Sequence, residues 1–216
     1  MTNLKKFYES YWSHDKPAPV KDPTTNLRSR LLLRTLKKYI AEAEDTISVL
    51  DAGCGMGQFT SLLSDKGYIV RGIDISDMAI EKARDLYPRI DFKVCSLEDK
   101  LPFGDQIFDV VWSTEVIEHI YDVYTYLHEV NRVLKSNGLF IMTTPYHGLI
   151  KNLAIVLFRF DTHFCNIEGG HIRFFSIRRL AELFKRVSFK IIETKHIGRI
   201  WPMCKSVYIV GRKMPQ

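Results

Sequence analysis

Segments with the character of β-strands alternate with segments of helical periodicity through most of the chain. Strand-like apolar runs are expected at residues 46–51, 68–74, 90–95, 108–113 and 138–143. Helical patterns are expected at residues 27–43, 57–65, 76–86 and 123–134. Because parallel neighbours in a sheet need a long crossover connection, this alternation predicts an α/β fold. The expected sheet is doubly wound, mostly parallel and seven-stranded, with helices on both faces.

The C-terminal part departs from this alternation. About thirty residues without a regular pattern, 146–175, come before an expected helix at 177–186 and two expected strands at 190–194 and 206–211. No helical pattern separates those two strands, so we expect the last strand to be antiparallel.

A single domain of four parts is expected. Residues 1–45 would form an N-terminal arm and a helix, 46–145 the core, 146–175 an insertion, and 176–216 the last helix and strands. The first 26 residues look loop-rich, because their prolines exclude a continuous helix there. A chain of 216 residues can bury a sizeable core without disulfide or metal support.

Composition and charge exclude several classes of protein. The 4 cysteines are scattered, which excludes a disulfide framework and favours a reducing, cytoplasmic location. No apolar run approaches the roughly 20 residues that span a bilayer, and no signal peptide is visible. Basic residues exceed acidic ones by 31 − 25 = 6 but are spread along the chain, with Arg28, Arg34 and Lys38 expected on a solvated helix face. We therefore expect no specific nucleic-acid partner.

A glycine-rich loop follows the first expected strand. Gly53, Gly55 and Gly57 let the backbone turn tightly and approach a ligand closely. A dinucleotide fingerprint would need a glycine where Gln58 stands, and Asp51 would repel a pyrophosphate. A carboxylate at this point favours a ligand with positive charge, such as the ammonium group of an amino acid. A tight turn that binds no ligand is the alternative.

Asp74 ends the second expected strand, in the sequence GIDIS. An acid at this strand end can accept hydrogen bonds from two vicinal ribose hydroxyls. Alone, it would equally well cap the next helix, for which Ser76 is the expected N-cap. Together, the loop and Asp74 flank one crevice beyond the carboxyl ends of the strands, which indicates a ligand site.

Three segments, VLDAGCGMG, GIDIS and LPFGDQIFDVVWSTEVIEH, resemble the class I S-adenosylmethionine-dependent methyltransferases, over nearly the whole chain. Within that superfamily the chain most resembles the ubiquinone-pathway O-methyltransferases. That likeness rests on an aromatic N-terminal helix with Tyr11-Trp12, a proline-bearing arm, Asn26-Leu27-Arg28 and the segment 116–119. The resemblance implies a Rossmann-like methyltransferase fold and S-adenosylmethionine as cofactor, with S-adenosylhomocysteine as its product.

The resemblance also implies a set of cofactor-binding residues. Gly53 would accept a hydrogen bond from the methionine amino group, with Gly55 leaving space beside it. Arg28 would pair with the methionine carboxylate, and Asp74 would hold the ribose. The remaining members of the implied set are Asp51, Gln58, Ile75, Ser96, Leu97, Glu98 and Thr114.

The adenine would lie between Ile75 and Leu97, with Ser96 or Glu98 near its amino edge. Many relatives have an acidic residue where Ser96 stands, so this is the least secure contact of the set.

Glu115, Glu118 and His119 stand at i, i+3 and i+4, so a helical segment would place them on one face. His119 is the expected general base, because its ordinary pKa lies close to working pH. Two carboxylates and an imidazole also suit a divalent cation, which His171 would help to bind. The metal site, with Glu115, Glu118, His119 and His171 as ligands, is the less favoured alternative.

Residues 146–175 are rich in large apolar side chains, interrupted by Lys151 and Arg159. In the superfamily such an insertion usually builds the acceptor site, so Tyr146 and His171 are the expected acceptor-binding residues. An apolar insertion with flanking cations also suits peripheral contact with a membrane. The alternative is a segment that packs on a core of its own.

These observations favour a methyltransferase that acts on the oxygen of a small hydroxylated acceptor, aromatic and quinol-like or a sugar. Two alternatives stay open. An RNA 2′-O-methyltransferase would show salt-sensitive RNA binding. A non-catalytic protein would bind S-adenosylmethionine without turnover.

Overall fold

The computed structural model describes residues 3–13, 22–40, 46–164 and 171–215. Its strands are β1 Ser48–Ala52, β2 Ile69–Asp74, β3 Asp91–Val94, β4 Phe108–Thr114, β5 Leu134–Pro145, β6 Phe189–Ile197 and β7 Ser206–Lys213. Its helices are α1 Asn3–Tyr11, α2 Thr25–Ile40, α3 Gln58–Ser64, α4 Asp77–Leu86, α5 Val123–Val133, α6 Leu149–Phe164, α7 Ile177–Arg186 and the 3₁₀ turn η1 Ile117–His119.

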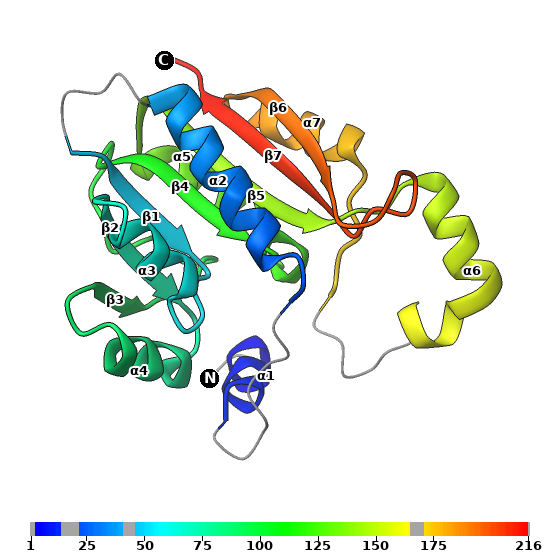
Figure 1. The fold of residues 1–216 in the computed structure, drawn as a ribbon, viewed down its shortest axis with the longest axis horizontal. Helices are drawn as coiled ribbons and strands as arrows, with labels where there is room; N and C mark the ends of the chain where they lie inside the picture. The colour runs from blue at the N-terminus through cyan, green and yellow to red at the C-terminus, as the bar shows by residue number, and fades with distance from the viewer. Residues whose placement is uncertain (1–2, 14–21, 41–45, 165–170, 216) are drawn as a thin grey trace.

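The strands form one seven-stranded sheet in the order β3-β2-β1-β4-β5-β7-β6 (Figure 1). The first five strands pair in parallel, and β7 lies antiparallel between β5 and β6. Both the doubly wound α/β class and the antiparallel last strand are therefore confirmed.

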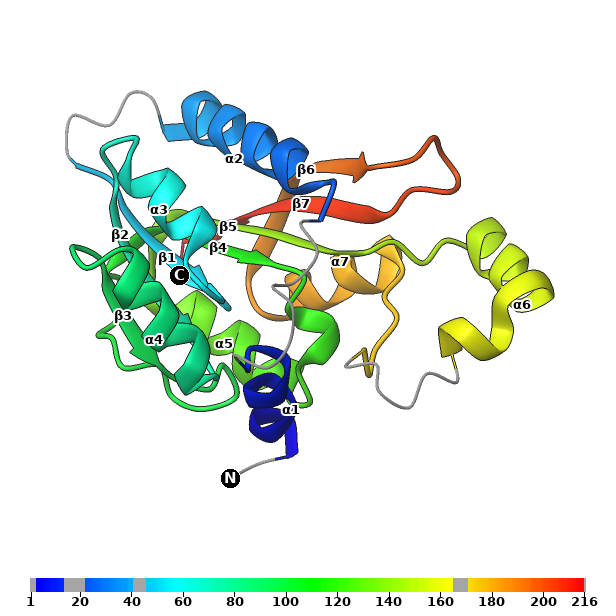
Figure 2. The ribbon, with the colours of Figure 1, turned by 60° about the horizontal axis from the view of Figure 1, so that its bottom comes forward.

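Helices cover the two faces of the sheet, and each face buries its own apolar cluster (Figure 2). The strand β5 contributes to both, because alternate side chains of a strand point to opposite faces. Phe140 packs on one side with Phe184 of α7, while Ile141 packs on the other with Leu32 of α2. The unbroken apolar run at residues 139–142 of β5 follows from this burial on both faces.

The order of the strands positions a crevice. From β1 the chain moves outward to β2 and β3 on one side, and β4 and β5 lie on the other side of β1. The carboxyl ends of β1 and β4 therefore mark the point where the winding direction reverses, and ligands of such sheets bind there.

Three local predictions are wrong. Residues 149–164 form the helix α6, with a non-helical residue at Arg159, where an irregular segment was expected. The N-terminal stretch that looks loop-rich contains the helix α1, in agreement with the aromatic N-terminal helix that the resemblance implies. The helix α5 ends at Val133, and β5 begins at Leu134 rather than at Gly138. The strand continues past Asn137, whose φ is +64°, through an irregularity in its pairing with β4. Pro17 and Pro19 lie outside the described residues.

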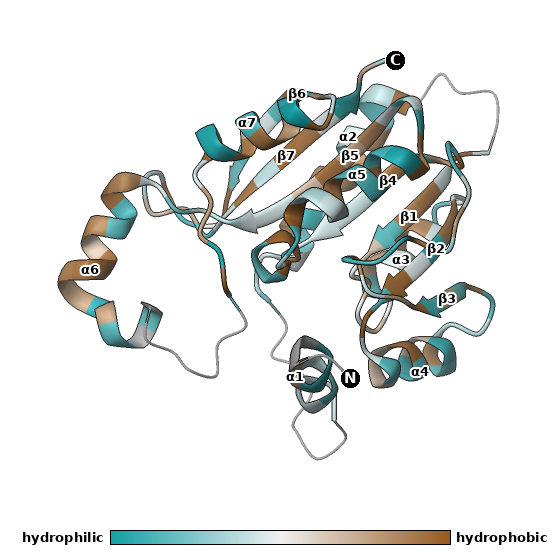
Figure 3. Ribbon diagram, turned by 180° about the vertical axis from the view of Figure 1, so that it is seen from behind, coloured by the Kyte–Doolittle hydropathy of each residue, from teal (hydrophilic) through white to brown (hydrophobic). Residues whose placement is uncertain are grey.

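The helix α6 stands away from the sheet at one end of the molecule (Figures 1 and 3). Seven of its large apolar side chains are exposed: Leu149, Ile150, Leu153, Val156, Leu157, Phe158 and Phe160. The alternative that this insertion packs on a core of its own is therefore wrong for α6. Among the described residues, no helix is long and apolar enough to cross a membrane.

Candidate cofactor and acceptor site

The glycine loop leaves β1 at the switch point and returns into α3. Gly53 has φ of +83° and Gly55 has φ of +51°, a backbone region that favours glycine. A Cβ atom on Gly53 would collide with the side chain of Val116, and one on Gly55 would touch the ring of Trp12. Both the conformation and the close packing therefore require glycine here.

Asp51 lies beneath this loop, at the end of β1, and is almost completely buried. Its Oδ2 accepts a hydrogen bond from the Thr60 hydroxyl at 2.6 Å, whereas its Oδ1 is buried without a hydrogen-bond partner in the described structure. Burial, with a smaller contribution from the nearby Asp74, raises the pKa of Asp51 to about 7. A buried acceptor without a donor costs free energy. A cationic donor placed at the loop would satisfy it.

Asp74 ends β2 and ties the two loops of the crevice together. Its Oδ2 accepts from the backbone N–H of Gly55 at 2.9 Å and its Oδ1 from that of Ser76 at 3.0 Å. Burial raises the pKa of Asp74, and these N–H groups partly oppose that rise. Ser76, not Asp74, is the N-cap of α4. A carboxylate has about four acceptor positions, so two remain for ribose hydroxyls.

The residues expected around the adenine differ in how deeply they are buried. Ile75 is half-buried beside Asp74, whereas Leu97 packs into the apolar cluster with only 6% of its surface exposed. The Ser96 hydroxyl accepts from the backbone N–H of Glu98, and the Glu98 carboxylate accepts from that of Tyr121. Their roles at the adenine stay predictions.

Two further residues of the expected cofactor set lie at element ends. Gln58 is exposed at the first position of α3. Thr114 ends β4, where its hydroxyl lies 2.7 Å from that of Thr143. Contact of either residue with the cofactor stays a prediction.

Arg28 is 4% exposed, so its expected place on a solvated helix face is wrong. Its guanidinium lies 2.9 Å from Asp22 and 3.1 Å from Glu115, and it donates to the Ser206 hydroxyl at 3.3 Å. Its Nε is buried without a partner in the described structure. Pairing of Arg28 with a ligand carboxylate stays a prediction. In the structure its guanidinium contacts two carboxylates and one hydroxyl of the same chain.

The expected common face of Glu115, Glu118 and His119 is wrong. Only residues 117–119 are helical, in a single 3₁₀ turn, and Glu115 precedes them with φ of +53°. The Glu115 carboxylate accordingly turns toward Arg28 and accepts from the Thr143 hydroxyl at 2.8 Å. It therefore does not join the other candidate metal ligands.

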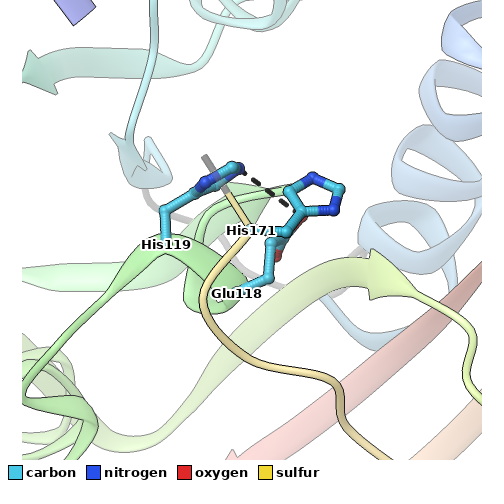
Figure 4. A group of neighbouring side chains, drawn as sticks. All are labelled: Glu118, His119 and His171. Carbon is cyan, nitrogen blue, oxygen red and sulfur yellow. Dashed lines mark ion pairs between the residues drawn. The ribbon is translucent and has the colours of Figure 1, made fainter. Parts of the chain in front are cut away.

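Glu118, His119 and His171 come together (Figure 4). The segment after α6 returns to this point because Ile172 N–H donates to the Glu118 carbonyl at 3.0 Å. The His119 and His171 rings lie 4.8 Å apart. One ligand atom from each of the three residues lies within 4.8 Å of the others. The donor set of two imidazoles and a carboxylate fits a divalent transition-metal ion or Zn²⁺.

The carboxyl group of Glu118 is buried. Its Oε2 accepts from the Thr144 hydroxyl at 2.9 Å, and its Oε1 has no hydrogen-bond partner in the described structure but lies 3.9 Å from His119 Nε2. Burial, with Glu115 nearby, raises the pKa of Glu118.

Tyr146, the other expected acceptor residue, is buried with its ring against that of His196 at 5.0 Å. Its role in acceptor binding stays a prediction.

Trp12 of the N-terminal segment was named only within the family likeness, and Tyr8 was missed. The Tyr8 ring meets the His119 ring edge-on at 5.7 Å, and Trp12 lies against Gly55. The spacing of Phe7, Tyr8, Tyr11 and Trp12 was the available signal, but it does not tell which face of α1 meets the crevice.

Comparisons with known proteins agree with this geometry. Residues 50–142 match the methyltransferase domain family. A probable S-adenosylmethionine-dependent methyltransferase of Mycolicibacterium smegmatis is 38% identical over 146 residues, covering 68% of this chain and 53% of that protein. The human mitochondrial ubiquinone biosynthesis O-methyltransferase is 39% identical over 118 residues, covering 51% of this chain and 32% of that protein.

The fold has solved relatives. The crystal structure of an S-adenosylmethionine-dependent methyltransferase from Methanosarcina mazei superposes with a TM-score of 0.67 and 22% identity, covering 84% of this chain and 98% of that one. This chain spans only about half, or less, of the two curated relatives. It carries a methyltransferase domain of the S-adenosylmethionine-dependent, Rossmann-like superfamily.

Proposed function

We propose that the chain is an S-adenosylmethionine-dependent methyltransferase that methylates the oxygen of a small hydroxylated acceptor. The observation that carries the cofactor assignment is Asp51 Oδ1, a buried acceptor without a donor at the glycine loop. Such an atom suits the ammonium group of the methionine moiety. Asp74, at the end of the next strand, suits the ribose hydroxyls.

The cofactor, when bound, supplies a methyl group on a positively charged sulfur with a good leaving group. The residues of the chain then have to align the acceptor oxygen with the methyl carbon and remove a proton. A C–O bond forms as the C–S bond breaks, and the hydroxyl proton passes to an imidazole nitrogen of His119. S-adenosylhomocysteine is the second product.

The same imidazole would be the ligand of a divalent cation in the alternative chemistry. A nitrogen lone pair that binds a metal cannot accept a proton, so the two roles of His119 exclude each other. We favour the base, because Glu115 pairs with Arg28 and only Glu118 of the two expected carboxylates joins His119 and His171 among the described residues.

The class of acceptor is inferred from likeness to relatives of known name. The human relative is named for ubiquinone biosynthesis, and by analogy we favour an aromatic, quinol-like acceptor over a sugar. Methyl transfer from radiolabelled cofactor into fractionated cell extract separates these from RNA. Cofactor binding without transfer to any fraction would favour the non-catalytic alternative.

We also propose peripheral contact with a membrane through α6. Ile200 and Trp201, in the turn between β6 and β7, are exposed like the apolar side chains of α6. Lys151 Nζ links the two segments by donating to the carbonyls of Tyr146 and Cys204 at 2.7 and 2.9 Å. Since those bonds occupy Lys151, its expected contact with lipid head groups is not favoured, and the contact would rest on the apolar side chains.

The first prediction concerns Asp74. The substitution Asp74→Asn replaces an acceptor-only group by one that presents donors to the ribose hydroxyls. We expect the Kd for S-adenosylhomocysteine, measured by calorimetry, to rise about ten- to a hundredfold, as for loss of hydrogen bonds to a charged group. Asp85→Asn, at an exposed position of α4, is the control and should bind like the unaltered chain. If the unaltered chain binds none of this molecule, the cofactor assignment is wrong.

The second prediction concerns pH. Because the pKa of Asp51 is raised to about 7 in the folded chain, the folded state binds its proton more tightly than the unfolded state. The resulting stability is present below pH about 4 and is lost as the pH rises through about 7.

Urea unfolding of the unaltered chain and of Asp51→Asn, without cofactor, measures this contribution. We expect the unaltered chain to lose on the order of 4 kcal/mol of unfolding free energy, relative to Asp51→Asn, between pH 4 and pH 8. A difference that does not change with pH would contradict the burial of an ionisable Asp51. Asp65→Asn, at an exposed position, should show no such trend.

The third prediction separates the base from the metal. With His119 as base, transfer after treatment with a chelator should stay within about twofold of the untreated rate, and His119→Ala should lower it by about a hundredfold or more. Loss of transfer on chelation, with recovery on adding Mn²⁺, would instead assign Glu118, His119 and His171 to a metal.

The fourth prediction concerns α6. We expect the chain to float with phosphatidylcholine vesicles in a density gradient and Phe158→Asp, at a side chain 81% exposed, to abolish flotation. Leu86→Asp, at an exposed apolar side chain of α4, is the matched control and should float like the unaltered chain. A chain that stays at the bottom of the gradient with both neutral and anionic vesicles has no lipid contact through α6.

A further inference from the structure

The helix α1 is fastened to α4 at one point. The Glu9 carboxylate accepts from the backbone N–H groups of Asp77 and Met78 at 2.7 and 3.3 Å. These groups belong to the first turn of α4, where no carbonyl of the helix can accept from them, and where negative charge is stabilised. Lys5 adds an ion pair with Asp77 at 2.6 Å.

A second contact fixes the end of the segment. Lys82, one turn further along α4, donates to the Trp12 carbonyl at 2.6 Å. Four polar contacts, two of them to the Glu9 carboxylate, therefore attach residues 5–12 to the helix that follows Asp74. Figure 2 shows α1 beside α4, across the carboxyl ends of the strands.

This attachment brings two aromatic side chains to opposite parts of the site. Trp12 lies against Gly55 of the glycine loop. Tyr8 meets His119 edge-on, with ring centroids 5.7 Å apart and an interplanar angle of 82°. Burial raises the pKa of Tyr8, and the carboxylates of Asp74 and Glu118 contribute to the rise, so its ring lies near both the expected ribose site and the expected base.

We propose that Tyr8 is a positioning residue for His119, held in place by the attachment of α1 to α4 through Glu9. His119 is the last residue of a single 3₁₀ turn, and the rings of Tyr8 and His171 lie beside its imidazole. An edge-on ring restricts rotation of the imidazole and so fixes the direction from which it meets the acceptor. The inference rests on the proposed function, because it assigns Tyr8 to the orientation of the proposed base.

The proposal separates two consequences of losing Tyr8. The cofactor contacts of Asp51, Gly53 and Asp74 come from β1, β2 and their loops, so they do not depend on the Tyr8 ring. Transfer does depend on the orientation of His119. Removing the ring should therefore lower kcat, with smaller effects on the KM for S-adenosylmethionine and on the Kd for S-adenosylhomocysteine.

The experiment compares Tyr8→Ala, Tyr8→Phe and the control Lys6→Ala, at an exposed position of the same helix. We expect Tyr8→Ala to lower kcat by about tenfold to a hundredfold, as for a misplaced catalytic group, and to change the Kd for S-adenosylhomocysteine less than about threefold. Tyr8→Phe keeps the ring and should restore kcat to within about threefold of the unaltered chain, as should Lys6→Ala.

A second readout needs no acceptor. The ring current of Tyr8 shifts the His119 ring signals in a ¹H–¹³C spectrum, so Tyr8→Ala should move the His119 signal and Tyr8→Phe should not. Glu9→Ala should reproduce both the shift and the loss of kcat. The double variant with Tyr8→Ala should be no worse than the poorer single variant, because both act through one contact.

Unchanged kcat and an unmoved His119 signal in Tyr8→Ala would overturn the proposal, as would a loss that Tyr8→Phe does not restore. Failure of the proposed function looks different, because the unaltered chain would then bind no S-adenosylhomocysteine at all.

Discussion

Two buried carboxylates at the ends of adjacent strands are the constraint on which the site depends. Asp51 and Asp74 repel each other and lose hydration, so each is held at a cost in folding free energy. Thr60 and the backbone of Gly55 and Ser76 offset part of that cost, but Asp51 Oδ1 has no donor among the described residues. A cationic ligand would relieve that cost, so ligand binding and stability are coupled here.

The sequence predicted those parts of the molecule that follow from local pattern. Alternating strands and helices predict the sheet. Gly53 and Gly55 mark the loop after the first strand, and the topology of such a sheet places this loop at the switch point. Arg28 could not be placed in this way. Arg28 is buried against the carboxylates of Asp22, which precedes its helix, and of Glu115, which follows β4 far along the sequence. Helical spacing reports neither partner, so spacing alone suggests that Arg28 is exposed.

The helix α6 was missed for a different physical reason. Its apolar residues at 149, 153, 156 and 160 recur at helical spacing, but the unbroken apolar run at 153–158 hides that period in the sequence. Glu115 shows a third kind of failure. The spacing of Glu115, Glu118 and His119 predicts one face only if the segment is α-helical, and a positive φ at Glu115 turns that carboxylate toward Arg28 instead.

The orientation of Glu115 bears on the chemistry at His119. With Glu115 paired to Arg28, the cluster around His119 keeps a single carboxyl group, that of Glu118. Burial raises the pKa of this group, which favours its neutral form over the ionised form that a metal ligand requires. A divalent cation would reverse this preference by stabilising the ionised form. The protonation state of one buried carboxyl therefore separates the two chemistries that the same three side chains allow.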